Sequence, residues 1–220
     1  MLHLLLLPMF FQLPDDEIIF PNPALAEEDG LLAIGGDLSL DRLLLAYSNG
    51  IFPWFSEGEP ILWYAPHKRC IIYPDKIKIS KSMKKVMKDE IFKITIDKAF
   101  SEVIQNCAST PRSGQNGTWI TNEMQDAYIN LHEYGFAHSV EVWLNEELVG
   151  GLYGLKINRV FCGESMFSHV SNASKAALIF LSKTDIDLID CQLPNDHLMS
   201  LGAELISQAA FMKILDPKIT

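Results

Sequence analysis

The chain has 220 residues, of which 48% are hydrophobic and 21% are charged, and its formal net charge is -10. This length can bury a substantial core as one large domain or two small ones, and the composition excludes a disordered chain or a repeat array. The negative charge argues against a protein that coats nucleic acid non-specifically, although a local basic patch could still bind a phosphate backbone.

The four cysteines are widely spaced, form no C-x-x-C pair and lie in apolar surroundings, at Cys70, Cys107, Cys162 and Cys191. This pattern is typical of reduced core cysteines in a cytosolic protein. No histidine stands at ligand spacing from them, so we expect no zinc or other metal site.

The chain opens on an apolar run, residues 1–11, which could pass for part of a signal peptide. No Lys or Arg precedes this run and an acidic PDDE segment follows it, so we interpret it as a strand or core segment. No window of the sequence approaches the length of a membrane span. We therefore expect a cytoplasmic protein that does not associate with a membrane.

Residues 13–36 are rich in Pro, Asp, Glu and Gly, which predicts loops around short extended pieces. A helix should follow, capped by Asp37 or Ser39 and ended by Gly50. The apolar face of this helix is formed at helical spacing by Leu40, Leu43, Leu44 and Tyr47.

Five aromatic residues then fall within thirteen positions among three prolines: Phe52, Trp54, Phe55, Trp63 and Tyr64. One interpretation is that these rings form the core of a small amino-terminal domain. The other is that one ring is left facing a cleft, where it can stack on a nucleic-acid base.

Residues 80–88, SKSMKKVMK, predict a helix that Ser80 caps and whose apolar face carries Met83, Val86 and Met87. The remaining face is basic and consists of Lys81, Lys84, Lys85 and Lys88. With Lys76 and Lys78, six of the 18 Lys and Arg residues fall between positions 76 and 88. A charge run is usually a solvated face, but a single sign within an acidic chain also favours a phosphate-binding surface.

The second half of the chain predicts a mixed pattern. A strand at 93–96 precedes two helices, one capped by Asp97 and one by Thr121, with a polar loop at 108–117 between them. Extended runs at 137–144, 148–157 and 160–167, joined by short turns, predict an antiparallel meander. The remaining elements are a helix from Asn172, a strand at 188–191, a helix near 197–201, a short strand at Leu205 and a helix from Gln208.

This order of elements is that of the acetyltransferase-like α+β fold. In that fold a Gly-rich loop before the helix after the central strand holds the pyrophosphate of coenzyme A with its backbone N–H groups. The corresponding segment here, SMFSHVSNAS, contains no glycine. The usual acyl-coenzyme donor would therefore lack its binding loop.

Two apolar strands of this half end in carboxylates, at Glu164 and at Asp190. Burying a carboxylate is costly, because desolvation disfavours its charged form, unless partners or a reaction make use of it. One interpretation is a site built around these two acids. The alternative is that both are ordinary strand-end acids exposed to water.

Eight short motifs occur in this order along the chain: GLLAIGGDLS, GIFPWFSEGEPILWYAP, GTWIT, HSVEVW, LVGGLYG, FCGESMFS, NASK and LIDCQLPNDH. Together they strongly resemble the leucyl/phenylalanyl-tRNA–protein transferase family of the bacterial N-end rule pathway. The resemblance covers nearly the whole chain. It implies an α+β fold, with a small amino-terminal α/β domain over residues 1–66. Residues 67–220 would form an acetyltransferase-like (GNAT-like) catalytic domain with a mainly antiparallel sheet.

The resemblance also implies an activity. Family members transfer Leu or Phe, and less readily Met, from aminoacyl-tRNA to the N-terminal Arg or Lys of acceptor proteins, which marks these proteins for degradation. The expected partners are therefore aminoacyl-tRNA and such acceptors, with no cofactor, and we expect a monomer.

The family's functional residues correspond to particular positions of this sequence. Asp190 and Gln192 match the residues assigned to catalysis, and Glu164 matches the acid that supports them. Trp54 resembles the ring near the terminal adenosine and Trp119 another pocket residue. The amino-acid pocket is matched by Leu152, Phe161 and Met166, and the basic cluster for the tRNA stem by Lys81, Lys84, Lys85 and Lys88. The segment before Asp190 is shorter than is usual in the family, and the frequent Arg near Gln208 is replaced.

The expected reaction is aminolysis of an ester, so positioning does most of the catalytic work. Asp190 would accept or steer the proton of the attacking amine, Gln192 would hold the amine or the developing oxyanion, and Glu164 would orient both. Alternatively, a tRNA ribose hydroxyl relays the proton and Asp190 acts only electrostatically. The competing functions are an N-acetyltransferase with an acyl-coenzyme A donor and a non-catalytic module that binds tRNA or basic N-termini.

Overall fold

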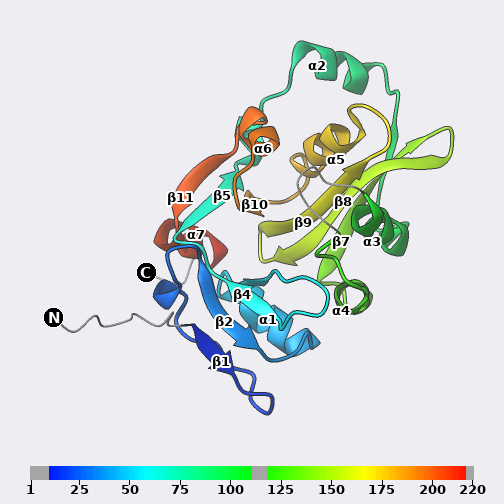
Figure 1. The fold of residues 1–220 in the computed structure, drawn as a ribbon. Helices are drawn as coiled ribbons and strands as arrows, with labels where there is room; N and C mark the ends of the chain where they lie inside the picture. Colours follow the sequence, from blue (N-terminus) through cyan, green and yellow to red (C-terminus); the bar gives the residue numbers. More distant parts are fainter. Residues whose placement is uncertain (1–9, 111–117, 217–220) are drawn as a thin grey trace.

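The computed structural model of the chain describes residues 10–110 and 118–216 (Figure 1). Helices and strands both contribute throughout, so the chain is an α+β protein. Residues 1–9 of the apolar start, expected to form a strand or core segment, and residues 111–117 of the polar loop lie outside the described residues. Within the described ranges, no helix has the length and apolar character that crossing a membrane requires.

The amino-terminal part forms a four-stranded sheet with the strand order β1-β2-β4-β3. Its elements are β1 (Phe11–Leu13), η1 (Pro23–Leu25), β2 (Leu31–Gly35), α1 (Leu40–Ser48), β3 (Phe52–Pro53) and β4 (Leu62–Tyr64). The predicted helix is confirmed as α1, which begins after Ser39 and buries Leu43 and Tyr47. The Ser39 side chain makes no capping hydrogen bond, and the Asp37 carboxylate instead accepts from the Ser39 amide at 2.8 Å. The helix ends before Gly50, which has a φ of 69° and so adopts the left-handed conformation that suits glycine.

The aromatic cluster is mostly core. Trp63, Phe52 and Phe55 are buried, and Tyr64 is half-buried. Trp54 differs, because 37% of its surface is exposed, although its ring centroid lies 5.7 Å from that of Tyr64. Core packing is therefore confirmed for three of the five rings, and Trp54 keeps a surface on which a planar group can stack.

The rest of the chain forms a seven-stranded sheet with the order β11-β5-β10-β9-β8-β7-β6. The strands are β5 (Lys68–Ile72), β6 (Lys93–Ile96), β7 (Ala137–Leu144), β8 (Glu147–Ile157), β9 (Val160–Ser168), β10 (Leu188–Gln192) and β11 (Glu204–Ser207). The predicted antiparallel meander is confirmed as β7, β8 and β9. β10 pairs parallel with β9 and antiparallel with β5, so this sheet is mixed.

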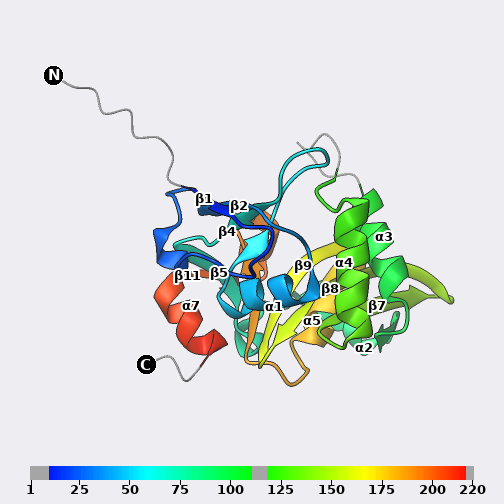
Figure 2. The same ribbon diagram turned by 90° about the horizontal axis from the view of Figure 1, so that it is seen from below.

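Helices cover both faces of this sheet (Figures 1 and 2). They are η2 (Pro74–Lys76), α2 (Lys81–Lys88), α3 (Phe100–Ser109), α4 (Asn122–Glu133), α5 (Ala173–Leu181), α6 (Asp196–Ser200) and α7 (Gln208–Leu215). Side chains of a strand alternate between the faces, and so Tyr153 of β8 joins the core under α3, α4 and the amino-terminal sheet. Leu152, its neighbour, joins the core under α2, α5 and α6.

Asp97 does not cap α3, contrary to the prediction. Its φ is 55°, and its carboxylate accepts hydrogen bonds from the Ser139 backbone and the His138 ring, both at 2.8 Å. The buried Glu141 of β7 instead accepts from the amides of Lys98 and Ala99, at 3.3 and 3.4 Å, at the start of α3. A partner 42 residues away thus takes the capping role, which local sequence cannot reveal.

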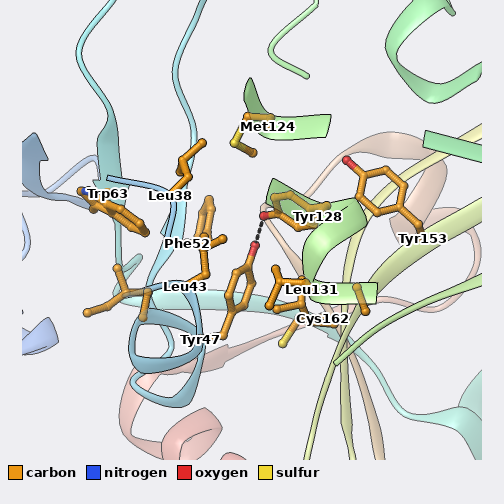
Figure 3. Close-up of a cluster of buried hydrophobic side chains, with 14 of the residues drawn as sticks. Leu38, Leu43, Tyr47, Phe52, Trp63, Met124, Tyr128, Leu131, Tyr153 and Cys162 are labelled. Carbon is orange, nitrogen blue, oxygen red and sulfur yellow. Dashed lines mark hydrogen bonds between the residues drawn. The ribbon is translucent and has the colours of Figure 1, made fainter. Parts of the chain in front are cut away.

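The two sheets share one continuous core. Tyr47 of α1 and Tyr128 of α4 meet through their hydroxyl groups, as the dashed line in Figure 3 shows. Leu43 and Trp63 of the amino-terminal part and Leu131 and Cys162 of the rest belong to the same buried cluster. Through α1, the amino-terminal part therefore packs against α4, and it shares this core with residues of β9 and β10.

Candidate active site

Glu164 and Asp190 lie at neighbouring positions of the parallel strands β9 and β10. Asp190 stands opposite Cys162, two residues before Glu164. Both acids are buried, with 8% of Glu164 and none of Asp190 exposed. The interpretation of two exposed strand-end acids is therefore wrong, because the parallel pairing carries both strand ends into the interior.

Gln192 joins the two acids. Its side-chain Nε2 donates to Glu164 Oε1 at 2.8 Å, and its backbone N–H donates to Asp190 Oδ1 at 2.9 Å. Its φ is 61°, in the left-handed region that few non-glycine residues adopt, and the pairing of β10 with β5 shifts register between Asp190 and Gln192. Such a backbone conformation at a strand end is typical of functional sites, where surrounding contacts hold it in place.

Glu164 also accepts a hydrogen bond from the hydroxyl of Tyr128, at 3.1 Å, and Tyr128 in turn meets Tyr47 (Figure 3). Burial disfavours the charged carboxylate and raises the pKa of Glu164 to about 7, although the hydrogen bonds from Tyr47, Tyr128 and Gln192 act in the opposite direction. Glu164 can therefore change its charge near neutral pH.

Arg69 of β5 pairs with Asp190, and sequence reasoning missed it. Its Nε and Nη2 donate to the two carboxylate oxygens at 2.8 and 2.7 Å. Burial alone would lower the pKa of Arg69, but the charge and hydrogen bonds of Asp190 outweigh it and raise the pKa above its ordinary value. The only local signal was a basic residue within the apolar strand KRCII. Tyr47 was predicted on the apolar face of its helix, without its polar partner Tyr128.

An open cavity of about 750 Å³ lies beside this network. Leu152, Phe161 and Met166 line it together, as do Glu164 and Gln192. Sequence reasoning did not name its other apolar residues, which come from α5, β10 and α6: Leu178, Leu181, Ile189 and Leu198. The cavity combines an apolar interior with a few convergent polar groups, which is typical of a small-molecule or side-chain binding site.

The two predicted tryptophans do not line this cavity. Trp54 follows β3 on the amino-terminal sheet and is partly exposed, and Trp119 is half-buried just before α4. Their expected roles near the adenosine and the pocket therefore require a ligand that extends beyond the cavity.

The predicted basic helix is confirmed as α2, with Ser80 accepting from the Met83 amide at 3.1 Å. Its four lysines are exposed, and Lys85 is paired with Asp89. α2 packs against α5, whose Leu178 and Leu181 line the cavity. The helix that carries the basic face therefore packs on the same helix, α5, that forms one wall of the cavity.

Two family models match the chain. Residues 71–216 match "Leucyl/phenylalanyl-tRNA protein transferase", and residues 36–67 match the N-terminal domain of the same family.

Proteins named leucyl/phenylalanyl-tRNA–protein transferase are similar over most of their length. One from Flavobacterium psychrophilum is 58% identical over 203 residues, covering 90% of this chain and 96% of that protein. One from Flavobacterium johnsoniae is 56% identical, covering 92% and 97%, and one from Stutzerimonas stutzeri is 51% identical, covering 94% of each. A solved structure of a functionally unknown protein from Staphylococcus epidermidis is 7% identical, with a TM-score of 0.46 and coverage of 80% and 68%.

Proposed function

The chain belongs to the leucyl/phenylalanyl-tRNA–protein transferase family, and on this premise we propose its substrates and the roles of its residues. It is an aminoacyltransferase that moves an amino acid from tRNA to the N-terminus of a protein. The amino acids are Leu and Phe, and less readily Met. The acceptors begin with Arg or Lys and are thereby marked for N-end rule degradation.

The observation that supports this proposal best is the apolar cavity beside the Gln192 and Glu164 pair. Leu152, Phe161 and Met166 form a slot for an apolar side chain, and the unbranched Met166 can adapt to both Leu and Phe. An apolar slot discriminates one methylene by only about 1–3 kcal/mol, which suits an enzyme that accepts more than one amino acid.

The tRNA would approach along the basic helix. Lys81, Lys84, Lys85 and Lys88 carry exposed positive charge on α2, next to the helix that lines the cavity. Trp54 is exposed enough to stack on the terminal adenine, which is worth about 1–3 kcal/mol, and Trp119 would contact the same end of the tRNA. The acceptor would meet Glu164 and Asp196, two acids that line the cavity and suit a positively charged terminus.

In the transfer step, the amine nitrogen of the acceptor attacks the ester carbonyl carbon. A C–N bond forms, the ester C–O bond breaks, and the proton that the amine loses ends on the departing ribose oxygen. Because Nε2 of Gln192 donates to Glu164, the acceptor atom of the amide is Oε1, which can take a hydrogen bond from the attacking amine. Gln192 thereby holds the amine in line for attack.

Asp190 has a supporting role in this mechanism. It is fully buried and accepts hydrogen bonds from Arg69 and from the Gln192 backbone. This arrangement favours the electrostatic alternative over direct proton transfer to Asp190, because the amine cannot reach a fully buried carboxylate.

The finer architecture follows the same family. We assign residues 1–66 to a small amino-terminal domain and residues 67–220 to an acetyltransferase-like catalytic domain. The element order and the parallel β9–β10 pair support the second assignment. The protein would act as a monomer in the cytoplasm.

The experiment offers two donors to one acceptor. The protein is incubated with a peptide beginning with Arg and either Leu-tRNA or acetyl-coenzyme A, and the peptide mass is measured. Addition of leucine from the tRNA supports the proposal, and a matched peptide beginning with Ala should remain unmodified. Acetylation of the Arg peptide would instead indicate an N-acetyltransferase, and no transfer from either donor would indicate a binding module.

A further inference from the structure

Arg69 contacts residues of β10, of the amino-terminal part and of α7. Besides its two bonds to Asp190, its Nη1 donates to the Gly50 carbonyl oxygen at 3.0 Å. The guanidinium also lies 4.8 Å from the ring centroids of both Phe52 and Phe211. With 2% of its surface exposed, Arg69 is held on every side by protein.

Stability alone does not account for this pair. A buried ion pair adds little net stability, because the cost of desolvating both charges offsets their attraction. The bidentate geometry instead fixes the orientation of the carboxylate. Asp190 Oδ1, which accepts from Arg69, also accepts from the backbone N–H of Gln192 at 2.9 Å. The position of that oxygen therefore determines where the left-handed backbone of Gln192 is held.

We propose that Arg69 is a positioning residue for aminoacyl transfer. It fixes Asp190, which holds the Gln192 backbone in its left-handed conformation and so directs the Gln192 amide toward Glu164 and the cavity. The Phe52 ring of β3 and the carbonyl of Gly50, in the turn before β3, place Arg69 from the amino-terminal part, so this part helps to set the geometry of the reaction. This inference rests on the proposed function and adds a residue and a coupling to it.

A second bidentate pair provides a matched control. Arg159 binds Asp187 through Nε and Nη2, both at 2.8 Å, immediately before β10 begins. Unlike Arg69, Arg159 is exposed, and neither Arg159 nor Asp187 lines the cavity. If an Arg–Asp pair just before β10 served equally well, Arg159→Met and Arg69→Met would impair transfer alike.

The test compares Arg69→Met, Asp190→Leu and the double variant. Each single variant leaves a buried charge without its partner and loses stability, whereas the double variant removes both charges at similar volume and should fold. We expect the single-turnover rate of the double variant to fall about 100-fold, with the Kd for Leu-tRNA unchanged. The fold-decrease in the rate of the double variant should not exceed that of the more impaired single variant, because both residues act through Gln192.

Arg69→Lys provides a version that keeps the charge but cannot form the bidentate pair. We expect a reduced rate with an unchanged Kd for Leu-tRNA, while Arg159→Met transfers at the parent rate. A parent-like rate in Arg69→Lys or in the double variant would overturn the inference. So would a fold-decrease in the rate of the double variant that equals the product of the fold-decreases of the two single variants. Transfer by the unsubstituted protein tests the proposed function, and the ratio of variant to parent rates tests this inference.

Discussion

The side-chain nitrogen of Gln192 lies 2.8 Å from an oxygen of Glu164 and joins the ends of two parallel strands. In the proposed mechanism, this contact leaves the Gln192 carbonyl oxygen to accept a hydrogen bond from the attacking amine. It also makes the orientation of the amide depend on the charge of Glu164, because a carboxylate is a stronger acceptor than a neutral acid. The pH dependence of the reaction should therefore report on this pair.

The first prediction concerns the rate as a function of pH. The α-amine of the acceptor, with a pKa near 8, and Glu164, with a pKa of about 7, must both be deprotonated for transfer. Below pH 7, the logarithm of kcat/KM should rise with pH at a slope approaching about 2, and Glu164→Gln should reduce this slope to about 1. A slope that Glu164→Gln leaves unchanged would exclude Glu164 from the mechanism.

A second prediction concerns stability. Folding raises the pKa of Glu164 from 4.5 to about 7, so between these values the folded protein binds more protons than the unfolded chain. The Glu164 contribution therefore falls as pH rises through this window, by about 3 kcal/mol in total. Urea unfolding at several pH values should show Glu164→Gln gaining stability relative to the parent from pH 5 to pH 8. A difference independent of pH would contradict the raised pKa.

A third prediction concerns Tyr128. Its hydroxyl donates to the Glu164 carboxylate and so lowers the pKa that burial raises. Tyr128→Phe should therefore move the Glu164 titration above pH 7 and reduce the rate at neutral pH. Tyr134→Phe is the control, because Tyr134 follows the same helix but is 65% exposed. The pH–rate profile decides the matter, and a midpoint that stays in place or falls would argue against this contact.

The fourth prediction concerns α2. Replacing Lys81, Lys84, Lys85 and Lys88 by Ala should weaken tRNA binding. It should also reduce the slope of log K against log salt by about 0.9 for each lysine that contacts a phosphate of the duplex. Transfer at saturating tRNA should be preserved. The control is Lys183→Ala with Lys213→Ala, which removes exposed charges elsewhere. Equal salt slopes for the parent and the α2 variant would remove this helix from the tRNA interface.

The helices and the meander could be predicted from local sequence patterns, because these elements are determined by residues that lie close together in the sequence. The face of α1 with Leu43 and Tyr47 follows from helical spacing alone, and the structure confirms that both are buried. The meander follows from extended runs joined by short turns. Glu164 and Asp190 stood out because carboxylates at the ends of apolar strands are costly to bury, whereas Gln192 was identified only through the family resemblance.

The remaining features depend on contacts between distant residues. Arg69 meets Asp190 across 121 positions, and Tyr128 meets Glu164 across 36. A basic residue beside Lys68 in an apolar strand gives no sign of which acid it faces. Asp97 has the residue type and position of a helix cap, but its carboxylate accepts a hydrogen bond from the Ser139 backbone of β7 instead. Side-chain partners of this kind are set by sheet order, which the sequence pattern alone did not specify.

The central claim is that Gln192 holds the acceptor amine beside an aminoacyl group seated in the cavity. The most direct test measures single-turnover transfer from Leu-tRNA to an Arg-initiated peptide by Gln192→Ala, with Gln125→Ala on α4 as the control. We predict a loss of about 100-fold or more in the rate, with the Kd for Leu-tRNA and the cooperative unfolding unchanged. A folded Gln192→Ala protein that transfers leucine at the parent rate would contradict the claim.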